Sequence, residues 1–238
     1  MKNNRKRAPI GGVAEIMWIM GIVLCSLGVC LSANSGFGVS MVAAPAFVLF
    51  NRLKDVLPWL TYGTMDYIFQ GVVVVLTALV CRRFKWKYLM AFGTAVLHGL
   101  CLDMWRLVFG TEVYATMGLR LVSGVMGAVI TALAISMFLR TYLPQQAYEL
   151  IVKEISERFN LNISKVKWFN DIIILLFAIV MMLVLFGQFD LELVGVGTVV
   201  ITLVNTPLIV MWGKGLDRFF ELTSRWPRFR NFFEKHFN

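Results

Sequence analysis

Two apolar stretches, each opened by an aspartate, decide the fold of this chain: residues 66–80 read DYIFQGVVVVLTALV and residues 171–186 read DIIILLFAIVMMLVLF. Each lies in a longer apolar run, residues 59–80 and 168–186, which has roughly the 20 residues that an α-helix needs to cross a bilayer. A carboxylate beside such a run is costly unless it faces a partner or water, so Asp66 and Asp171 are candidate functional residues. Because the stretches lie 105 positions apart in similar surroundings, we expect a chain built from two related halves.

The composition places the chain among membrane proteins. Hydrophobic residues make up 58% of its 238 residues and charged residues only 16%, far from the balance of soluble domains. The basic start at residues 1–7 leads into an apolar run at residues 13–33 with no small-residue cleavage site after it, so we expect this first span to be retained. The sequence therefore predicts an all-α polytopic membrane protein.

Six apolar runs have the length of a membrane helix. We expect them to form helices over residues 13–33, 59–80, 88–109, 118–139, 168–186 and 191–212. Between the first two lies a shorter apolar stretch, residues 37–50, which Pro45 interrupts. This stretch is too short to cross as a helix, so we predict a re-entrant or interfacial segment.

The distribution of Lys and Arg sets the orientation. If residues 37–50 do not cross, 19 of the 23 Lys and Arg residues fall on one side of the membrane; if they do cross, the division becomes 8 against 15. Because positive charge gathers on the cytoplasmic side, six spans with both termini in the cytoplasm are predicted. The net charge of +9 then reflects this bias, and we expect no nucleic-acid partner.

The two halves of the chain follow the same order of segments. Residues of about 10–110 and 115–213 each contain a span, a short segment with a proline (Pro45 or Pro144), a span with an aspartate and a third span. Three crossings per half place the second half upside down relative to the first, and such inverted repeats build many transporters. We therefore predict a single membrane domain over residues 1–238, made of two inverted three-helix repeats.

Two amphipathic segments are predicted outside the six spans. Residues 143–161 mix charged and apolar side chains at helical spacing, which is typical of a helix on the cytoplasmic face of a membrane. We expect its apolar side to be turned toward lipid or protein: Leu143, Ala147, Leu150, Ile151 and Phe159. Residues 214–238 repeat aromatic and leucine side chains among Lys and Arg, which predicts a C-terminal amphipathic helix on the inner leaflet.

Small residues at helical spacing predict where two helices approach closely. They are Cys25, Gly28, Ser32 and Ser35 in the first span, and Ser123, Gly127 and Thr131 in the fourth. The same stripes would also suit a homodimer, and that alternative stays open. The four cysteines show no C-x-x-C pair, so we expect them to be small core residues.

Polar side chains inside or beside the spans are the candidates for binding a small-molecule ligand in a cavity between the halves. They are Asp66, Gln70, Asp171, Asn34, Asn205 and His98. Asp66 and Gln70 are four residues apart and share a helix face. The alternative for Asp66 and Asp171 is that each caps the N-terminus of its helix. His98 is interpreted either as an interhelical hydrogen-bonding residue or as part of a proton relay.

Charged residues near the outer ends of the third and fourth spans form a second group. Asp103 and Arg106 are three residues apart, so the simplest prediction is a mutual salt bridge. The alternative is that Arg106 and Arg120 flank an extracellular entrance and bind an anionic group.

Motifs for catalysis are missing from the sequence. There is no H-E-x-x-H pair, no phosphate loop and no G-x-G-x-x-G. The triplet Gly38-Val39-Ser40, with His98 as a base, is similar to part of an intramembrane serine protease, but Ser40 precedes a proline-broken segment. We therefore expect no enzymatic activity, no catalytic residue, no metal site and no cofactor.

Short glycine-based motifs resemble the YczE/YyaS/YitT group of bacterial integral membrane proteins. They are SANSGFGVS at residues 32–40, LTYG at 60–63, FND at 169–171 and GVGT at 195–198. The resemblance covers nearly the whole chain and implies a bacterial inner membrane location and a six-span fold. It supplies no mechanism and no catalytic residues.

Three functional hypotheses follow for a protein embedded in the lipid bilayer. The first is a small-molecule transporter or facilitator with a polar cavity between the repeats. The second is a substrate-binding subunit that works with a separate energising partner. The third is an accessory or scaffold protein that transports nothing.

Overall fold

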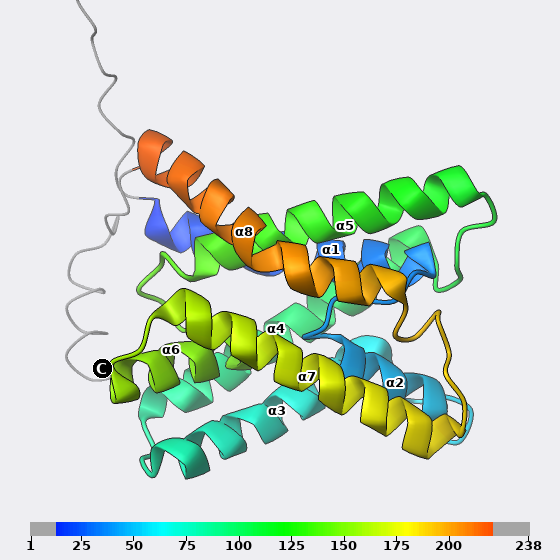
Figure 1. Cartoon of the computed structure of the whole chain (residues 1–238), viewed down its shortest axis with the longest axis horizontal. Coiled ribbons are helices and arrows are strands. Elements are labelled where there is room, and N and C mark those ends of the chain that lie inside the picture. Colours follow the sequence, from blue (N-terminus) through cyan, green and yellow to red (C-terminus); the bar gives the residue numbers. More distant parts are fainter. Residues whose placement is uncertain (1–12, 221–238) are drawn as a thin grey trace, which may run out of the picture.

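The computed structural model describes residues 13–220 and contains eight α-helices in that range (Figure 1). Six are long and apolar enough to cross a membrane: α1 (Ala14–Ser35), α3 (Tyr62–Cys81), α4 (Trp86–Phe109), α5 (Met117–Phe138), α7 (Ile163–Phe186) and α8 (Val196–Phe219). They confirm the six predicted spans, although α7 begins five residues earlier and α8 ends seven residues later than predicted. The chain is an all-α polytopic membrane protein.

Side-chain caps fix the starts of the two helices that carry the aspartates. Thr61 Oγ1 accepts a hydrogen bond from Thr64 N at 3.0 Å where α3 begins. Asn162 Oδ1 accepts one from Ser164 N at 2.9 Å where α7 begins. These oxygens satisfy amides that have no partner within the helix. Asp66 and Asp171 therefore lie inside their helices, and the prediction that they are N-caps is wrong.

Two short helices complete the fold, α2 (Ala44–Leu53) and α6 (Ala147–Phe159). At 1.5 Å per residue they are about 15 and 20 Å long, shorter than the roughly 30 Å of a bilayer core. Val42, just before α2, packs in one buried cluster with Val73 of α3 and Tyr148 of α6. The beginnings of both short helices therefore lie in the interior of the bundle.

The two ends of the bundle are distinct. α1, α4 and α7 begin at one end, where α3, α5 and α8 finish and where α6 lies (Figure 1). Ion pairs join these segments, since Lys85 Nζ lies 3.0 Å from Glu154 Oε2 and Arg140 Nε lies 2.8 Å from Asp217 Oδ1. We call this end the basic end, and the other the opposite end.

Small residues let α1 and α5 pack with their backbones in close contact. A Cβ atom on Gly28 would lie 2.8 Å from Gly127 O, and a Cβ atom on Gly127 would lie 2.8 Å from Gly28 O. Ser123 Oγ donates a hydrogen bond to Leu31 O at 2.7 Å along the same contact. The predicted stripes of small residues are therefore confirmed as a packing surface inside one chain.

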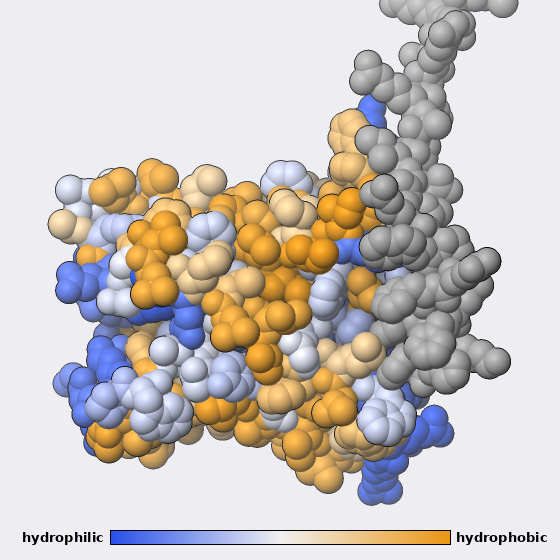
Figure 2. Space-filling model, turned by 180° about the vertical axis from the view of Figure 1, so that it is seen from behind, coloured by the Kyte–Doolittle hydropathy of each residue, from blue (hydrophilic) through white to orange (hydrophobic). Residues whose placement is uncertain are grey.

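The surface between the two ends is apolar. In Figure 2 hydrophobic side chains cover the middle of the face and hydrophilic ones gather toward the two ends. Large apolar side chains of the spans are exposed, for example Leu107 of α4 (88%) and Val184 of α7 (77%). Such a surface suits lipid.

Cys25, Cys30 and Cys81 are buried and free, as predicted for small core residues.

The predicted C-terminal amphipathic helix begins inside a longer element. α8 continues through residues 214–219, which are helical. The rest of that predicted helix, residues 221–238, lies outside the described residues, as does the basic start at residues 1–12.

Candidate functional site

Asp66, Gln70 and His98 form one buried hydrogen-bonded group. Asp66 Oδ2 accepts a hydrogen bond from Gln70 Nε2 at 2.8 Å and lies 2.9 Å from His98 Nδ1. All three side chains are buried. Gln70 and Asp66 share a face of α3, as predicted, and His98 reaches them from α4. The interhelical interpretation of His98 is therefore confirmed.

Asp171 belongs to a second buried group, which contains a cation. Lys167 Nζ lies 2.9 Å from Asp171 Oδ1 and 3.7 Å from Glu149 Oε1. The exposed fractions of these residues are 3%, 0% and 2%, in that order. Asp171 and Lys167 lie one turn apart on α7, and Glu149 comes from α6. A buried ammonium between two carboxylates is attracted to both.

The start of α6 joins the two groups. Ala147 N donates a hydrogen bond to Gln70 Oε1 at 3.2 Å, and Glu149 two residues later faces Lys167. The first turn of α6 therefore links the group held by α4 and α3 to the group held by α6 and α7. We call these residues the polar network: His98, Asp66, Gln70, Ala147, Glu149, Lys167 and Asp171.

The structure corrects the prediction that residues 143–161 form a helix on the membrane surface. Ala147 and Leu150 are buried as expected, but Glu149 and Glu154 on the charged side are buried as well, and Phe159 is exposed. The physical reason is that lysines of α4 and α7 pair with these carboxylates, so α6 is held inside the bundle on two sides.

Glu154 anchors the other end of α6. Its carboxylate pairs with Lys85 and Lys87 and accepts a hydrogen bond from Tyr88 Oη at 2.8 Å. Burial raises the pKa of the Glu154 carboxyl, but the hydrogen bonds from Lys87, Lys85 and Tyr88 outweigh it, so the pKa lies below its ordinary value. The carboxylate is therefore ionised at neutral pH.

A cavity of about 500 Å³ at the basic end reaches the polar network. Lys167 forms part of its wall, together with Arg140 and with Thr206, Lys214 and Asp217 of α8. The cavity lies between helices that belong to the second half of the chain. A small polar molecule that entered it would meet Lys167, which pairs with Asp171 and Glu149 on its other side.

Asn34 and Asn205, two other predicted binding residues, lie apart from the polar network. Asn34 Nδ2 donates a hydrogen bond to Gly110 O at 3.1 Å and so holds the loop between α4 and α5. Asn205 lies in the wall of a separate groove between α5 and α8. The structure therefore does not bring the six predicted residues into one site.

The charged residues of the opposite end have partners other than those predicted. Asp103 accepts hydrogen bonds from Thr61 Oγ1 at 2.6 Å and from Gly63 N at 2.8 Å, which ties α4 to the start of α3. Within residues 13–220 no salt bridge joins Asp103 to Arg106. The i, i+3 spacing alone was not decisive, because the first turn of α3 offers Asp103 a donor.

The two arginines at this end are turned toward backbone and rings. The Arg106 guanidinium lies 5.4 Å from the centroid of the Tyr62 ring and donates to Thr111 O at 3.3 Å. Arg120 donates to Ser35 O at 2.9 Å and to Gly36 O at 3.0 Å, at the end of α1. These contacts turn both guanidinium groups toward the protein itself, and an entrance for an anionic group stays a prediction.

Sequence reasoning missed Lys167 and Glu149. Lys167 lies four residues before Asp171, which is the spacing of an ion pair on one helix face. The spacing could have identified this pair, but the span was predicted to begin at residue 168, so Lys167 fell just outside it. Among the described residues, no group of three His, Cys, Asp or Glu side chains lies close enough together to hold a metal ion.

Comparisons with known proteins agree with the family resemblance of the sequence motifs. A family model described as "Family of unknown function (DUF6198)" matches residues 13–214. The chain is similar to the "Uncharacterized protein YyaS" of Bacillus subtilis (strain 168), with 27% identity over 143 residues that cover 58% of this chain and 68% of that protein. No solved structure matches.

Proposed function

The chain belongs to the DUF6198 family, a family of unknown function, and we propose that it is a transporter or facilitator that passes a small polar solute across the bacterial inner membrane. The polar network is the proposed binding site. The observation that carries the proposal is the pair of buried ionisable groups, one around Asp66 and one around Asp171, which the start of α6 links and of which the second meets a cavity at Lys167.

The energetics of burial favour a functional role for these groups. Removing a carboxylate or an ammonium from water costs several kcal/mol per ion. The attraction to a well-placed partner of opposite charge offsets about the same amount. Apolar residues of similar volume would stabilise the fold at least as well. Ionisable groups inside a membrane bundle therefore point to a path for a solute or an ion.

Two inverted repeats are part of the proposal, with α1–α4 as the first and α5–α8 as the second. Two sets of contacts match between the halves: α1 packs on α4 as α5 packs on α8, and α3 packs on α6 as α7 packs on α2. The contact of α1 with α5 is reciprocal. A Cβ atom on Gly127 would meet Ser32 Oγ, four residues after Gly28, and one on Gly28 would meet Thr131 Oγ1, four residues after Gly127.

The short helices fit the role of re-entrant half-helices. α2 leads from the interior toward the opposite end, and α6 leads from the interior toward the basic end (Figure 1). Half-helices of this kind place their N-termini near the bilayer midplane, where many transporters bind their solutes. The Gln70 amide, bonded to the first turn of α6, lies at this place.

The route is open at the basic end and closed at the opposite end in this arrangement. The cavity beside Lys167 supports access from the basic end. At the opposite end Asp103 holds the start of α3, and a Cβ atom on Gly99 of α4 would lie 2.5 Å from Gly63 O of α3. By the distribution of Lys and Arg, the basic end and both termini face the cytoplasm.

Thermal unfolding of the purified protein in detergent, against a panel of small polar metabolites, tests the proposal. A solute that binds only the folded state raises the melting temperature. We expect a shift in the wild type that Asp66→Asn and Asp171→Asn abolish. Asp55→Asn is the control, because that side chain is exposed and outside the polar network.

Two outcomes would favour the other hypotheses. A flat panel with unimpaired aspartate variants would point to an accessory or scaffold protein. A shift accompanied by copurification of an ATPase would point to a substrate-binding subunit. In each of these cases, as in the transport proposal, the chain catalyses no reaction.

A further inference from the structure

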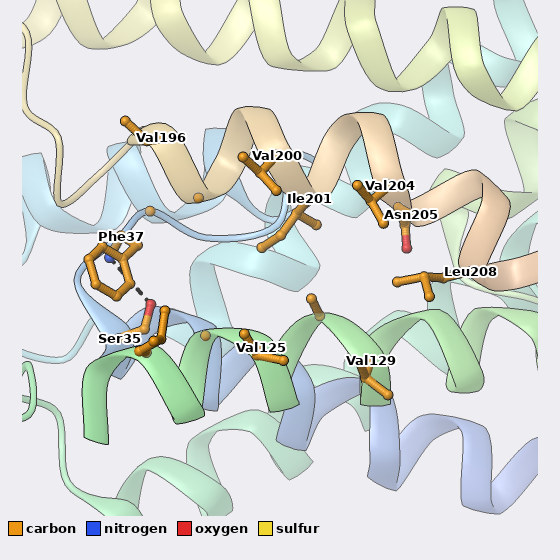
Figure 3. Close-up of a pocket in the computed structure, with 15 residues that line it drawn as sticks. Ser35, Phe37, Val125, Val129, Val196, Val200, Ile201, Val204, Asn205 and Leu208 are labelled. Carbon is orange, nitrogen blue, oxygen red and sulfur yellow. Dashed lines mark hydrogen bonds between the residues drawn. The ribbon is translucent and has the colours of Figure 1, made fainter. Parts of the chain in front are cut away.

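A groove between α5 and α8, apart from the polar network, holds a cavity of about 600 Å³. Val125 and Val129 of α5 lie across it from Val200 and Val204 of α8 (Figure 3). Its wall is apolar and contains no charged residue among the side chains that line it. The groove thus lies between two helices whose outer surfaces are suited to lipid.

Asn205 interrupts this apolar wall. It is 1% exposed, and both its Oδ1 and its Nδ2 lack a hydrogen-bond partner among the described residues. Figure 3 shows its oxygen directed into the gap between α8 and α5. Ser35, the other polar side chain of the wall, already donates to Ser32 O at 2.7 Å. A buried amide with both atoms unpaired requires a specific explanation.

The depth of Asn205 limits what can pair with it. The residue lies about 14 Å along α8 from its first residue, near the middle of a bilayer core about 30 Å thick. Acyl chains present only hydrocarbon at that depth. They can fill the groove, but they leave the amide unpaired.

We propose that the groove binds an apolar molecule with a single uncharged hydrogen-bonding group, which enters sideways from the bilayer and pairs with Asn205. A cavity of 600 Å³ lies in the usual range for small-molecule sites, which are apolar with a few polar groups. An amide both donates and accepts, so an alcohol or an amide satisfies both atoms of Asn205. The uncharged wall excludes ionised head groups. This site does not depend on the proposed transport path.

Photolabelling in lipid nanodiscs tests the site. The probe is hexadecanol with a diazirine in mid-chain, and the competitors are hexadecanol and hexadecane, which differ only in the hydroxyl group. We expect labels on Val125, Val129 and Val200, and competition about tenfold stronger by the alcohol, the effect of one hydrogen bond to an otherwise unpaired group. Asn205→Leu is expected to keep the labelling and abolish the tenfold preference. Ser35→Ala is the control and is expected to retain it.

The melting temperature without added probe gives an independent readout. If Asn205 pairs only with a ligand, Asn205→Leu removes two unpaired buried atoms and raises the melting temperature of the protein without ligand. A lower melting temperature, with the preference for the alcohol retained, would mean that Asn205 has a structural partner, and it would overturn the proposal. Equal competition by hexadecane would overturn it as well, because the groove would then take acyl chains alone.

Discussion

Lys167→Met is the most informative substitution for the charged half of the polar network. The ammonium lies 2.9 Å from one Asp171 oxygen and 3.7 Å from one Glu149 oxygen. With an effective dielectric constant of 20, these separations correspond to attractions of about 6 and about 4.5 kcal/mol, which offset the cost of burying the three charges. Methionine keeps most of the length of the side chain and removes the charge, so both carboxylates lose their cation.

The net loss should be smaller than the summed attractions. Breaking a buried ion pair by removing one partner costs about 3–5 kcal/mol in proteins, and we expect a loss of this size in the free energy of unfolding. Reversible denaturation in mixed micelles measures it. Lys165→Met, two residues earlier on α7 and exposed, is the control and should change stability by less than about 0.5 kcal/mol.

A rescue experiment separates loss of charge balance from loss of packing. Lys167→Met combined with Glu149→Gln and Asp171→Asn leaves no unpaired ion, so most of the lost stability should return. If Lys167→Met is as mild as Lys165→Met, the ammonium is not held between two buried carboxylates. The reasoning about the polar network would then be refuted.

Three further predictions concern helix packing, pH and capping. Gly99→Ala should cost about 1–3 kcal/mol, because its Cβ atom would lie 2.5 Å from Gly63 O. Gly93→Ala has nothing within 4 Å of its Cβ position, so it should be neutral or stabilise the fold by up to about 1 kcal/mol. Chemical denaturation compares the stability of the two variants. The pKa of Glu154 is depressed below 4.5 in the folded protein, so its stabilising effect is present above about pH 4.5 and is lost as the pH falls through the folded pKa. The difference in melting temperature between the wild type and Glu154→Gln should therefore be full at pH 7 and shrink below pH 4.5, and a difference that stayed constant would contradict this. Asn162→Ala should cost about 1 kcal/mol by removing the cap of α7, and hydrogen exchange should increase in its first turn alone.

The sequence predicted those features that depend on local patterns. The spans followed from the length of the apolar runs, and the shared face of Asp66 and Gln70 followed from helical periodicity. The packing of Gly28 against Gly127 followed from small residues at helical spacing. Each of these features depends on a few residues that are close together in the sequence.

Features that depend on which helices become neighbours could not be predicted from the sequence. Asp103 was expected to pair with Arg106 on its own helix, but α3 lies beside it and provides Gly63 N. Residues 143–161 were expected to lie on the membrane surface, because the buried position of Glu149 depends on α6 folding back against α7. Spacing along one helix does not tell which partner a charge meets across an interface.

A solute path that reaches the polar network from the basic end can be detected with a single cysteine at Thr206. This residue lies in the wall of the cavity that contains Lys167. In a variant without the four native cysteines, Thr206→Cys is treated in sealed vesicles of either orientation with a charged, membrane-impermeant thiol reagent. Leu203→Cys, on the exposed apolar surface of the same helix, is the control.

We predict that Thr206→Cys reacts with reagent added on the cytoplasmic side, and that a solute which raises the melting temperature slows this reaction. Leu203→Cys should stay unreactive, because the thiolate that reacts does not form in hydrocarbon. If Thr206→Cys is as unreactive as Leu203→Cys from both sides, no aqueous path reaches the network, and the account of this protein as a transporter is contradicted.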